Sequence, residues 1–141
     1  MTYDEAAELL LVHAYAHPDA DHSGMGTGFL GMLRPYRGLQ ERNFHEVMQA
    51  LQAVAPQLQT GPSVDRQLIS ALWGLCHYAR AWALEPEGML RRNHLISPTD
   101  QTRLADWLNI ISDTVSNLLE GAADAVAFEA YRLHLEDSAD E

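Results

Sequence analysis

The sequence predicts an all-α fold, a compact single-domain bundle of four to five helices. Apolar residues recur with the 3.6-residue period of a helix along almost the whole chain, and no alternating pattern typical of strands competes. Helix-start signals stand at residues 2–5, 43–46 and 97–100. The 141 residues, of which 47% are apolar, suit one globular domain over residues 1–135, followed by an acidic, frayed tail over residues 136–141.

A first helix is expected over residues 3–16, because Thr2 and Glu5 form a capping box at its start. Residues 17–28 combine Gly, Pro, Asp and Ser, which favour a loop. A short helical turn is then expected over residues 28–33, shortly before a proline ends it.

The second helix is expected to begin at a capping box made by Asn43 and Glu46 and to kink or end at Pro56. Its apolar stripe predicts a buried face of Phe44, Val47, Met48, Leu51 and Val54. A third helix over residues 65–84 has a wide apolar arc, which predicts the central helix of the bundle. Gly74 inside it costs about 1 kcal/mol relative to alanine, and close packing of a neighbouring helix is the expected compensation.

A fourth long helix is expected over residues 98–120, with Ser97 as its N-terminal cap and Gly121 as its C-terminal glycine. It has the cleanest apolar stripe in the chain, made of Leu104, Trp107, Leu108, Ile111, Val115 and Leu118. A weaker last helix is expected over residues 122–135.

Two segments of the chain share four letters. Gly31-Met32-Leu33-Arg34 recurs as Gly88-Met89-Leu90-Arg91, and each copy follows a helix and a loop and precedes a capped helix. Two related helical hairpins, produced by duplication, would explain the match. The flanking residues do not align, so a chance match is the alternative.

The charge is strongly acidic and unevenly distributed. Nine arginines, no lysine and twenty acids give a net charge of −11, which argues against a nucleic-acid binder. Residues 1–22 carry a net charge of −5 and residues 106–141 one of −8, whereas residues 23–105 carry +2. The arginines of the middle segment are therefore either neutralised by the acidic terminal segments or available to bind an anion.

The sequence also predicts a soluble, cytoplasmic protein without a membrane partner. The chain starts with neither a basic segment nor a long apolar run, and no stretch of about 18 apolar residues could span a membrane. A single cysteine, Cys76, cannot form an internal disulfide.

Histidines offer one candidate metal site. His13 and His17 are four residues apart and would share a face of the first helix, and His22 follows closely. No glutamate stands between them as in an HExxH motif, so no bound metal is expected, with His17 capping the helix end instead. A metal-dependent, hydrolase-like bundle that uses His13 and His17 is the alternative function, with His45 and His77 as further ligands.

A glycine-rich segment over residues 24–28 precedes the short turn. Its backbone amides could face an anion, although no strand precedes it and no Gly-Lys-Ser/Thr follows, so neither a dinucleotide fold nor a P-loop is supported. Arg34, Tyr36 and Arg37 lie just downstream and could close over a carboxylate or phosphate. A plain loop is the alternative.

The central helix carries a polar stripe. Arg66, Ser70, Trp73, His77 and Arg80 fall within one narrow arc. This stripe is either the solvent edge of the helix, with the tryptophan partly covered, or a binding hot spot in which arginines stack on the indole and pair with a carboxylate. Ser70 and His77 are two turns apart, too far for a nucleophile and its base.

No catalytic signature emerges, and no cofactor is expected. The sequence favours a non-enzymatic, acidic interaction module that engages a protein partner or a small anionic ligand near Trp73 and Arg80. The contacts are assigned to Arg66, Trp73, His77, Arg80, Arg34 and Arg37. Assembly into a homo-oligomer stays open.

Overall fold

Helices dominate the structure, a computed structural model that describes residues 1–139, and that range contains no strand. The all-α prediction is confirmed. The elements in chain order are α1 (Tyr3–His13), the 3-10 turns η1 (Met25–Thr27) and η2 (Gly31–Leu33), α2 (Glu41–Gln59), α3 (Arg66–Ala83), α4 (Met89–Arg92), α5 (Pro98–Leu119), α6 (Asp124–Ala127) and α7 (Glu129–Ala139). Within the described chain, none of these helices combines the length and apolar character that a membrane span needs.

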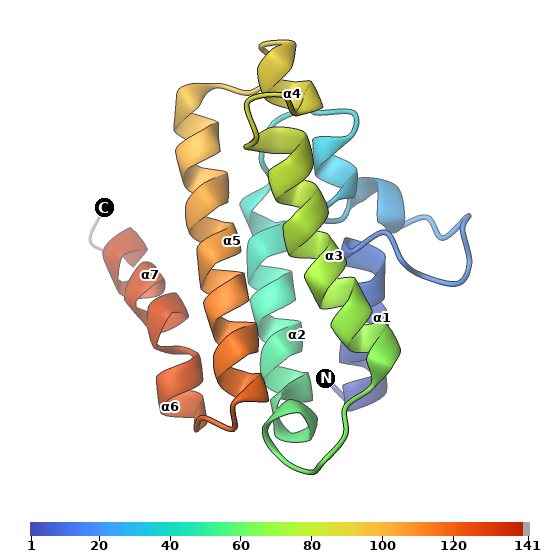
Figure 1. The fold of residues 1–141 in the computed structure, drawn as a ribbon, viewed down its shortest axis with the longest axis vertical. Helices are drawn as coiled ribbons and strands as arrows, with labels where there is room; N and C mark the ends of the chain where they lie inside the picture. Colours follow the sequence, from blue (N-terminus) through green and yellow to red (C-terminus); the bar gives the residue numbers. More distant parts are fainter. Residues whose placement is uncertain (140–141) are drawn as a thin grey trace.

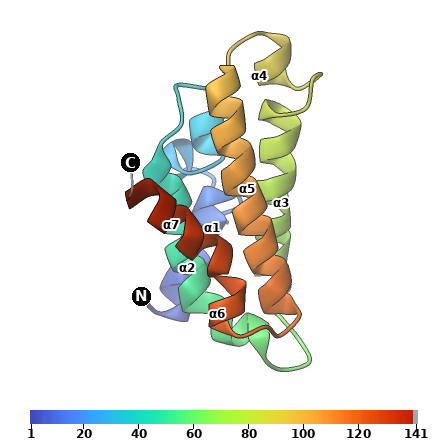
Figure 2. The ribbon, with the colours of Figure 1, turned by 90° about the vertical axis from the view of Figure 1, so that its left-hand side faces the viewer.

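Four helices form the bundle, and the rest covers its ends and one side. α1 packs against α2 and α3, and α5 packs against the same two helices, so that α2 and α3 occupy opposite corners (Figure 1). α1 and α3 run in one direction, and α2 and α5 run in the other. Figure 2 shows α7 lying across the side made by α2 and α5, which leaves the side between α3 and α5 uncovered by any further helix.

α1 begins as predicted and ends early. Thr2 and Glu5 form the expected capping box, with both hydrogen bonds at 3.1 Å. The helix ends at His13 instead of residue 16, because Tyr15 adopts a φ of 56° and turns the chain out of the helix. His17 therefore lies outside α1, and the expectation that it shares a helix face with His13 or caps the helix is wrong.

α2 departs from the sequence prediction at both ends. It begins at Glu41, and Asn43 is not a cap: its side chain is buried and donates to the carbonyl of Thr27 at 3.1 Å. Pro56 does not end the helix, which continues to Gln59 with the proline on its exposed side. The predicted buried stripe of α2 is confirmed.

The later helices follow the predicted signals closely. Asp65 caps α3, Ser97 caps α5 through the amide of Asp100 at 3.1 Å, and Gly121 takes the left-handed conformation after α5, with a φ of 83°. The expected last helix is two helices, α6 and α7, and α7 continues to Ala139 instead of ending at residue 135. The rest of the predicted tail, residues 140–141, lies outside the described residues.

The two repeated segments occupy equivalent local situations. A Cβ atom on Gly31 would collide with the carbonyl oxygen of Met25, and one on Gly88 would collide with that of Ala81. Each glycine opens a short helical turn whose leucine, Leu33 or Leu90, is fully buried. The second turn is α4.

An aromatic cluster joins the helices in the core. The rings of Phe44 on α2 and Trp107 on α5 are stacked, with centroids 5.4 Å apart and planes 5° apart. Phe29 from the α1–α2 connection packs edge-on against Trp107, and Tyr131 from α7 packs edge-on against Phe44. Trp107 is therefore the residue through which three separate segments share one core.

We expect Trp107→Ala to lower the free energy of unfolding by about 3–5 kcal/mol, because it empties the centre of this cluster. Denaturant unfolding followed by circular dichroism measures the loss. Trp73→Ala is the matched control, since Trp73 is 63% exposed and its removal should cost less than about 1 kcal/mol. Equal losses in the two variants would contradict this account of the core.

Candidate functional site

A groove of about 600 Å³ runs between α3 and α5 on the uncovered side of the bundle. We call it the Trp73 groove. It is lined by Ile69, Leu72, Trp73, Cys76, His77, Arg80, Ala81 and Glu85, and by Ser112, Val115, Ser116 and Leu119. Most of these side chains are apolar, and the charged groups lie toward the C-terminal end of α3. Three residues assigned to the site from the sequence, Trp73, His77 and Arg80, thus lie together in one groove.

Trp73 forms a rigid plate at the edge of the groove. Its indole is 63% exposed, and the imidazole of His77, one turn later, stacks on it with centroids 4.4 Å apart and planes 12° apart. Both sequence-based interpretations, the solvent edge and the binding hot spot, place Trp73 at the surface, and it lies there. An exposed indole that is held flat by a neighbour loses little side-chain entropy when it binds.

Arg80 crosses the groove from α3 to α5. Its Nη2 donates to the hydroxyl of Ser112 at 3.0 Å, to the carbonyl of Leu108 at 3.3 Å and to the side-chain oxygen of Asn109 at 3.4 Å. All three acceptors are neutral, and no carboxylate of residues 1–139 pairs with this guanidinium. The positive charge is therefore fixed in position and available to an acidic group.

Most of the other arginines in the middle segment also make no ion pair in the described structure. Among the arginines of residues 23–105, Arg103 alone pairs with a carboxylate in the described structure, and its partner Asp100 belongs to the same helix. Within residues 1–139, the acidic terminal segments thus do not neutralise the middle segment by direct ion pairs.

Three predicted contacts lie away from the Trp73 groove. Arg66 lines a hollow on the opposite side of α3, beside Tyr15 and Tyr78. The guanidinium carbon of Arg34 sits 5.5 Å from the ring centroid of Trp82. Arg37 is exposed and makes no side-chain hydrogen bond in the described chain. The single arc that the sequence indicated is divided between two faces of α3.

Tyr36 does not close over a ligand as the sequence suggested. Its hydroxyl donates to the Asp100 carboxylate at 2.6 Å, which ties the connection before α2 to the start of α5. Burial, together with that carboxylate, raises the pKa of Tyr36 above its ordinary value.

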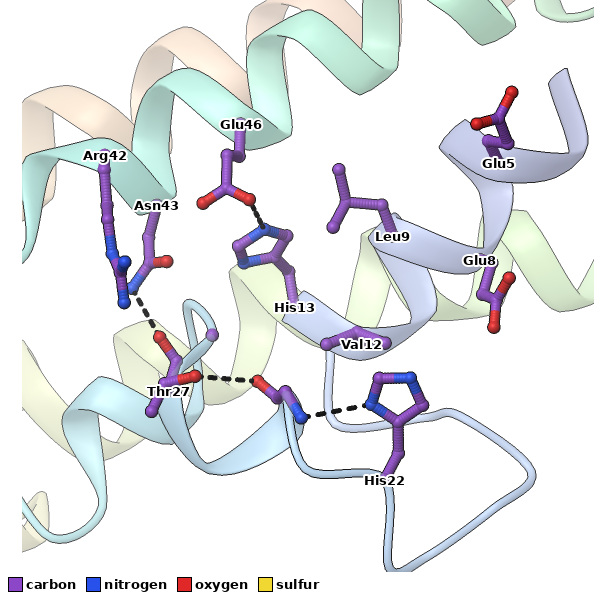
Figure 3. Close-up of a pocket in the computed structure, with 12 residues that line it drawn as sticks. Glu5, Glu8, Leu9, Val12, His13, His22, Thr27, Arg42, Asn43 and Glu46 are labelled. Carbon is purple, nitrogen blue, oxygen red and sulfur yellow. Dashed lines mark hydrogen bonds and ion pairs between the residues drawn. The ribbon is translucent and has the colours of Figure 1, made fainter. Parts of the chain in front are cut away.

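A pocket of about 500 Å³ surrounds His13, between α1, α2 and the glycine-rich segment (Figure 3). His13 is 2% exposed, and its Nδ1 accepts a hydrogen bond from the amide of Phe29 at 2.9 Å. The proton of the neutral ring is therefore on Nε2, which is buried, lacks a hydrogen-bond partner and points toward Glu46, 3.9 Å away. The amide of Phe29, directly after the glycine-rich segment, thus donates to His13 and not to an anion.

His17 and His22 meet Glu8 at the mouth of this region. Ligand atoms of the three side chains lie within 4.8 Å of one another, which is the closest approach to the metal site that the sequence suggested. However, the Nδ1 atoms of His17 and His22 accept the amides of Asp19 and Gly24, at 3.0 and 3.1 Å. Both Nε2 atoms then carry a proton, as in His13, and a metal ligand needs a free lone pair at that nitrogen.

The remaining histidines of the alternative site do not converge with these. His45 Nδ1 contacts the hydroxyl of Tyr131 on α7 at 2.7 Å, and His77 stacks on Trp73. The sequence did not predict this contact, because Tyr131 lies 86 positions away along the chain.

Comparisons with protein-family models, with curated proteins and with solved structures find no match to this chain.

We expect His13 to make the protein less stable in mild acid. Burial, with a smaller effect of Arg42, lowers the pKa of His13 from 6.5 to about 4. The unfolded chain then binds more protons than the folded protein between these two values, so the free energy of unfolding falls by up to about 3 kcal/mol as the pH drops through this window. Denaturant unfolding at a series of pH values measures it. His13→Asn keeps an acceptor for Phe29 but does not titrate, and an unchanged pH dependence in that variant would contradict the assignment.

We also expect calorimetric titration with Zn²⁺ to show no saturable site with a Kd below about 10 μM. The reason is that hydrogen bonds from three backbone amides to the Nδ1 atoms of His13, His17 and His22 keep the protons on Nε2. His94→Ala, at an exposed position elsewhere, is the control for His22→Ala. One equivalent of bound zinc that is lost in His22→Ala and kept in His94→Ala would restore the metal-site hypothesis.

Proposed function

We propose that this protein is a non-enzymatic binding module whose Trp73 groove receives an amphipathic helix of a protein partner, with a carboxylate of that helix opposite Arg80. One observation carries the proposal: an exposed indole and an arginine without an acidic partner in the described chain stand together in a largely apolar groove. Tryptophan and arginine are the residues most enriched among binding hot spots.

The shape of the groove supports a helical occupant. On α3 it is lined by residues 69, 72, 73, 76, 77 and 80, which follow the i, i+3, i+4, i+7 spacing of one helix face. These positions span about 17 Å, the length of roughly three helical turns. Helices that bind in grooves bury apolar residues at the same spacing.

The charges favour one orientation of that helix. Glu85, two residues beyond the end of α3, lines the same groove as Arg80. A partner helix with an acidic residue and, one to two turns away, a basic residue could satisfy both groups at once. The net charge of −11 would assist the approach of a partner that is basic outside the groove.

The local chemistry supports binding rather than catalysis. Cys76 is the thiol-bearing residue of the groove. Burial raises the pKa of its thiol, which keeps the thiol protonated and a poor nucleophile.

We expect selection from a phage-displayed library of amphipathic helices of about four turns, with Glu or Lys at the polar positions, to enrich Glu-containing peptides on the wild-type protein. Trp73→Ala should weaken the enriched peptides by about 30-fold, or about 2 kcal/mol, while the melting temperature stays nearly unchanged. Arg80→Glu should shift the enrichment from Glu to Lys at the position opposite residue 80. Peptide affinities are measured by fluorescence anisotropy.

Three results would contradict the proposal. The first is a selection in which the wild-type protein enriches no peptides beyond those that Trp73→Ala enriches. The second is an affinity of the enriched peptides for Trp73→Ala within about twofold of their affinity for the wild type. The third is a wild-type dimer in light scattering that becomes a monomer in Trp73→Ala, because the groove would then be filled by a second copy of the chain.

A further inference from the structure

A second hollow lies on the other side of α3, facing the end of α1, and it is independent of the Trp73 groove. It consists of two adjoining parts of about 660 and 430 Å³ that share Ala14, Tyr15 and Tyr78. We call it the tyrosine cleft. Tyr15 is 55% and Tyr78 45% exposed, so two aromatic rings face solvent at its centre.

Tyr15 is an unfavourable residue for its backbone position. The amides of Tyr15 and Ala16 bond back to the carbonyls of Val12 and Leu11, at 3.1 and 2.8 Å, which is the Schellman ending of a helix. The residue at this position has a φ of 56°, a conformation that favours glycine. At the end of α5 the equivalent position is Gly121. A tyrosine here gives up local stability without burying its ring.

Gly74 is equally unexpected for its surroundings. It lies in the middle of α3, and the predicted compensation was a closely packed neighbouring helix. That prediction is wrong: a Cβ atom on Gly74 would meet only the ring of Tyr78, at an ordinary contact distance of 3.6 Å. Packing inside the protein therefore accepts alanine, which is the better helix former. Gly74 also lines the tyrosine cleft.

Both unfavourable choices face the same cleft. Positions where a sequence departs from what its local structure prefers, with no gain in packing, concentrate at functional sites. One position keeps an aromatic ring in the cleft, and the other keeps a methyl group out of it. Together they indicate a surface suited to a planar ligand.

The charges at the cleft indicate an anion. Arg34 lines the smaller part and is held over the ring of Trp82, and Arg66 lines the larger part. Neither guanidinium pairs with a carboxylate from the described part of this acidic chain. Guanidinium groups next to aromatic faces recognise carboxylates, sulfonates and phosphates attached to planar rings.

We propose that the tyrosine cleft binds a small planar aromatic anion, with its ring against Gly74, Tyr15 and Tyr78 and its acidic group on Arg34. The ring supplies apolar contact, and the acidic group sets the orientation of the ligand along α3. A ligand with a second acidic group at its far end would also reach toward Arg66.

The proposal is tested with two dyes that share one aromatic framework. 8-Anilinonaphthalene-1-sulfonate carries the anionic group, and N-phenyl-1-naphthylamine lacks it. We expect the sulfonate to bind the wild-type protein saturably below about 100 μM, and Arg34→Gln to weaken it at least about fivefold while changing the neutral dye less than about twofold. Fluorescence titration measures both affinities.

Two further variants separate binding from stability. Gly74→Ala should raise the melting temperature by about 4 °C and Tyr15→Gly should leave it unchanged or higher, while each weakens the sulfonate at least about fivefold. His94→Gly is the matched control, because His94 also has a φ of 56° after a short helix but lies outside the cleft. It should relieve the backbone without changing dye affinity.

Three results would contradict binding in the tyrosine cleft. No saturable binding by the wild-type protein would overturn the proposal, and so would unchanged affinity in Gly74→Ala and Tyr15→Gly. Loss of dye binding in Trp73→Ala alone would place the dye in the Trp73 groove and overturn the cleft assignment. None of these results bears on helix binding in that groove, which is measured with peptides.

Discussion

The hydrogen bonds that His13 makes hold the longest connection of the fold in place. The amide of Phe29 donates to the imidazole at 2.9 Å, and the amide of Leu30 donates to the His13 carbonyl at 3.0 Å. Gly28 allows this approach, since a Cβ there would lie only 3.3 Å from His13. Because the connection is fixed at this point, Phe29 reaches Trp107 in the core and the chain from Tyr15 onward forms a wall of the tyrosine cleft. A single buried imidazole thus links the core to a surface.

The parts of the fold that depend on local signals could be predicted from the sequence. Capping residues such as Thr2 and Ser97 act on neighbours three residues away, and the stripe of α5 needs only its own period. The start of α2 was mispredicted because a distant segment decides it: Asn43 resembles a cap but bonds to Thr27. The end of α1 was mispredicted for a local reason, since the left-handed residue after it is Tyr15, where a sequence pattern would look for glycine.

The candidate sites show the same division. The period of α3 placed Trp73, His77 and Arg80 on one arc, and they share a groove. The period could not show that Arg66, on the same arc, lies near α1 instead, because the position of a neighbouring helix decides which face is open. Nor could the tautomers of His13, His17 and His22 be predicted, since each depends on one particular backbone amide. For His13 that amide is 16 residues away.

α3 is a wall shared by two surfaces with different chemistry. Its outer face, beside α5, is apolar with a fixed guanidinium, and its other face, beside α1, is aromatic with arginines at both ends. In an acidic protein these arginines lie where other molecules can reach them, and none of them pairs with a carboxylate in the described chain. One helix therefore separates two surfaces of different chemistry, and a side-chain change on one face need not disturb the other.

The two glycines of the repeated four-letter segments suggest how such a repeat can arise. Gly31 and Gly88 each pass so close to a backbone carbonyl that no larger residue fits, and each is followed by residues that enter the core and an arginine that leaves it. The same steric demand at two places would select glycine at both, with or without a common ancestor. Both glycines would be kept for as long as the carbonyls of Met25 and Ala81 stay where they are.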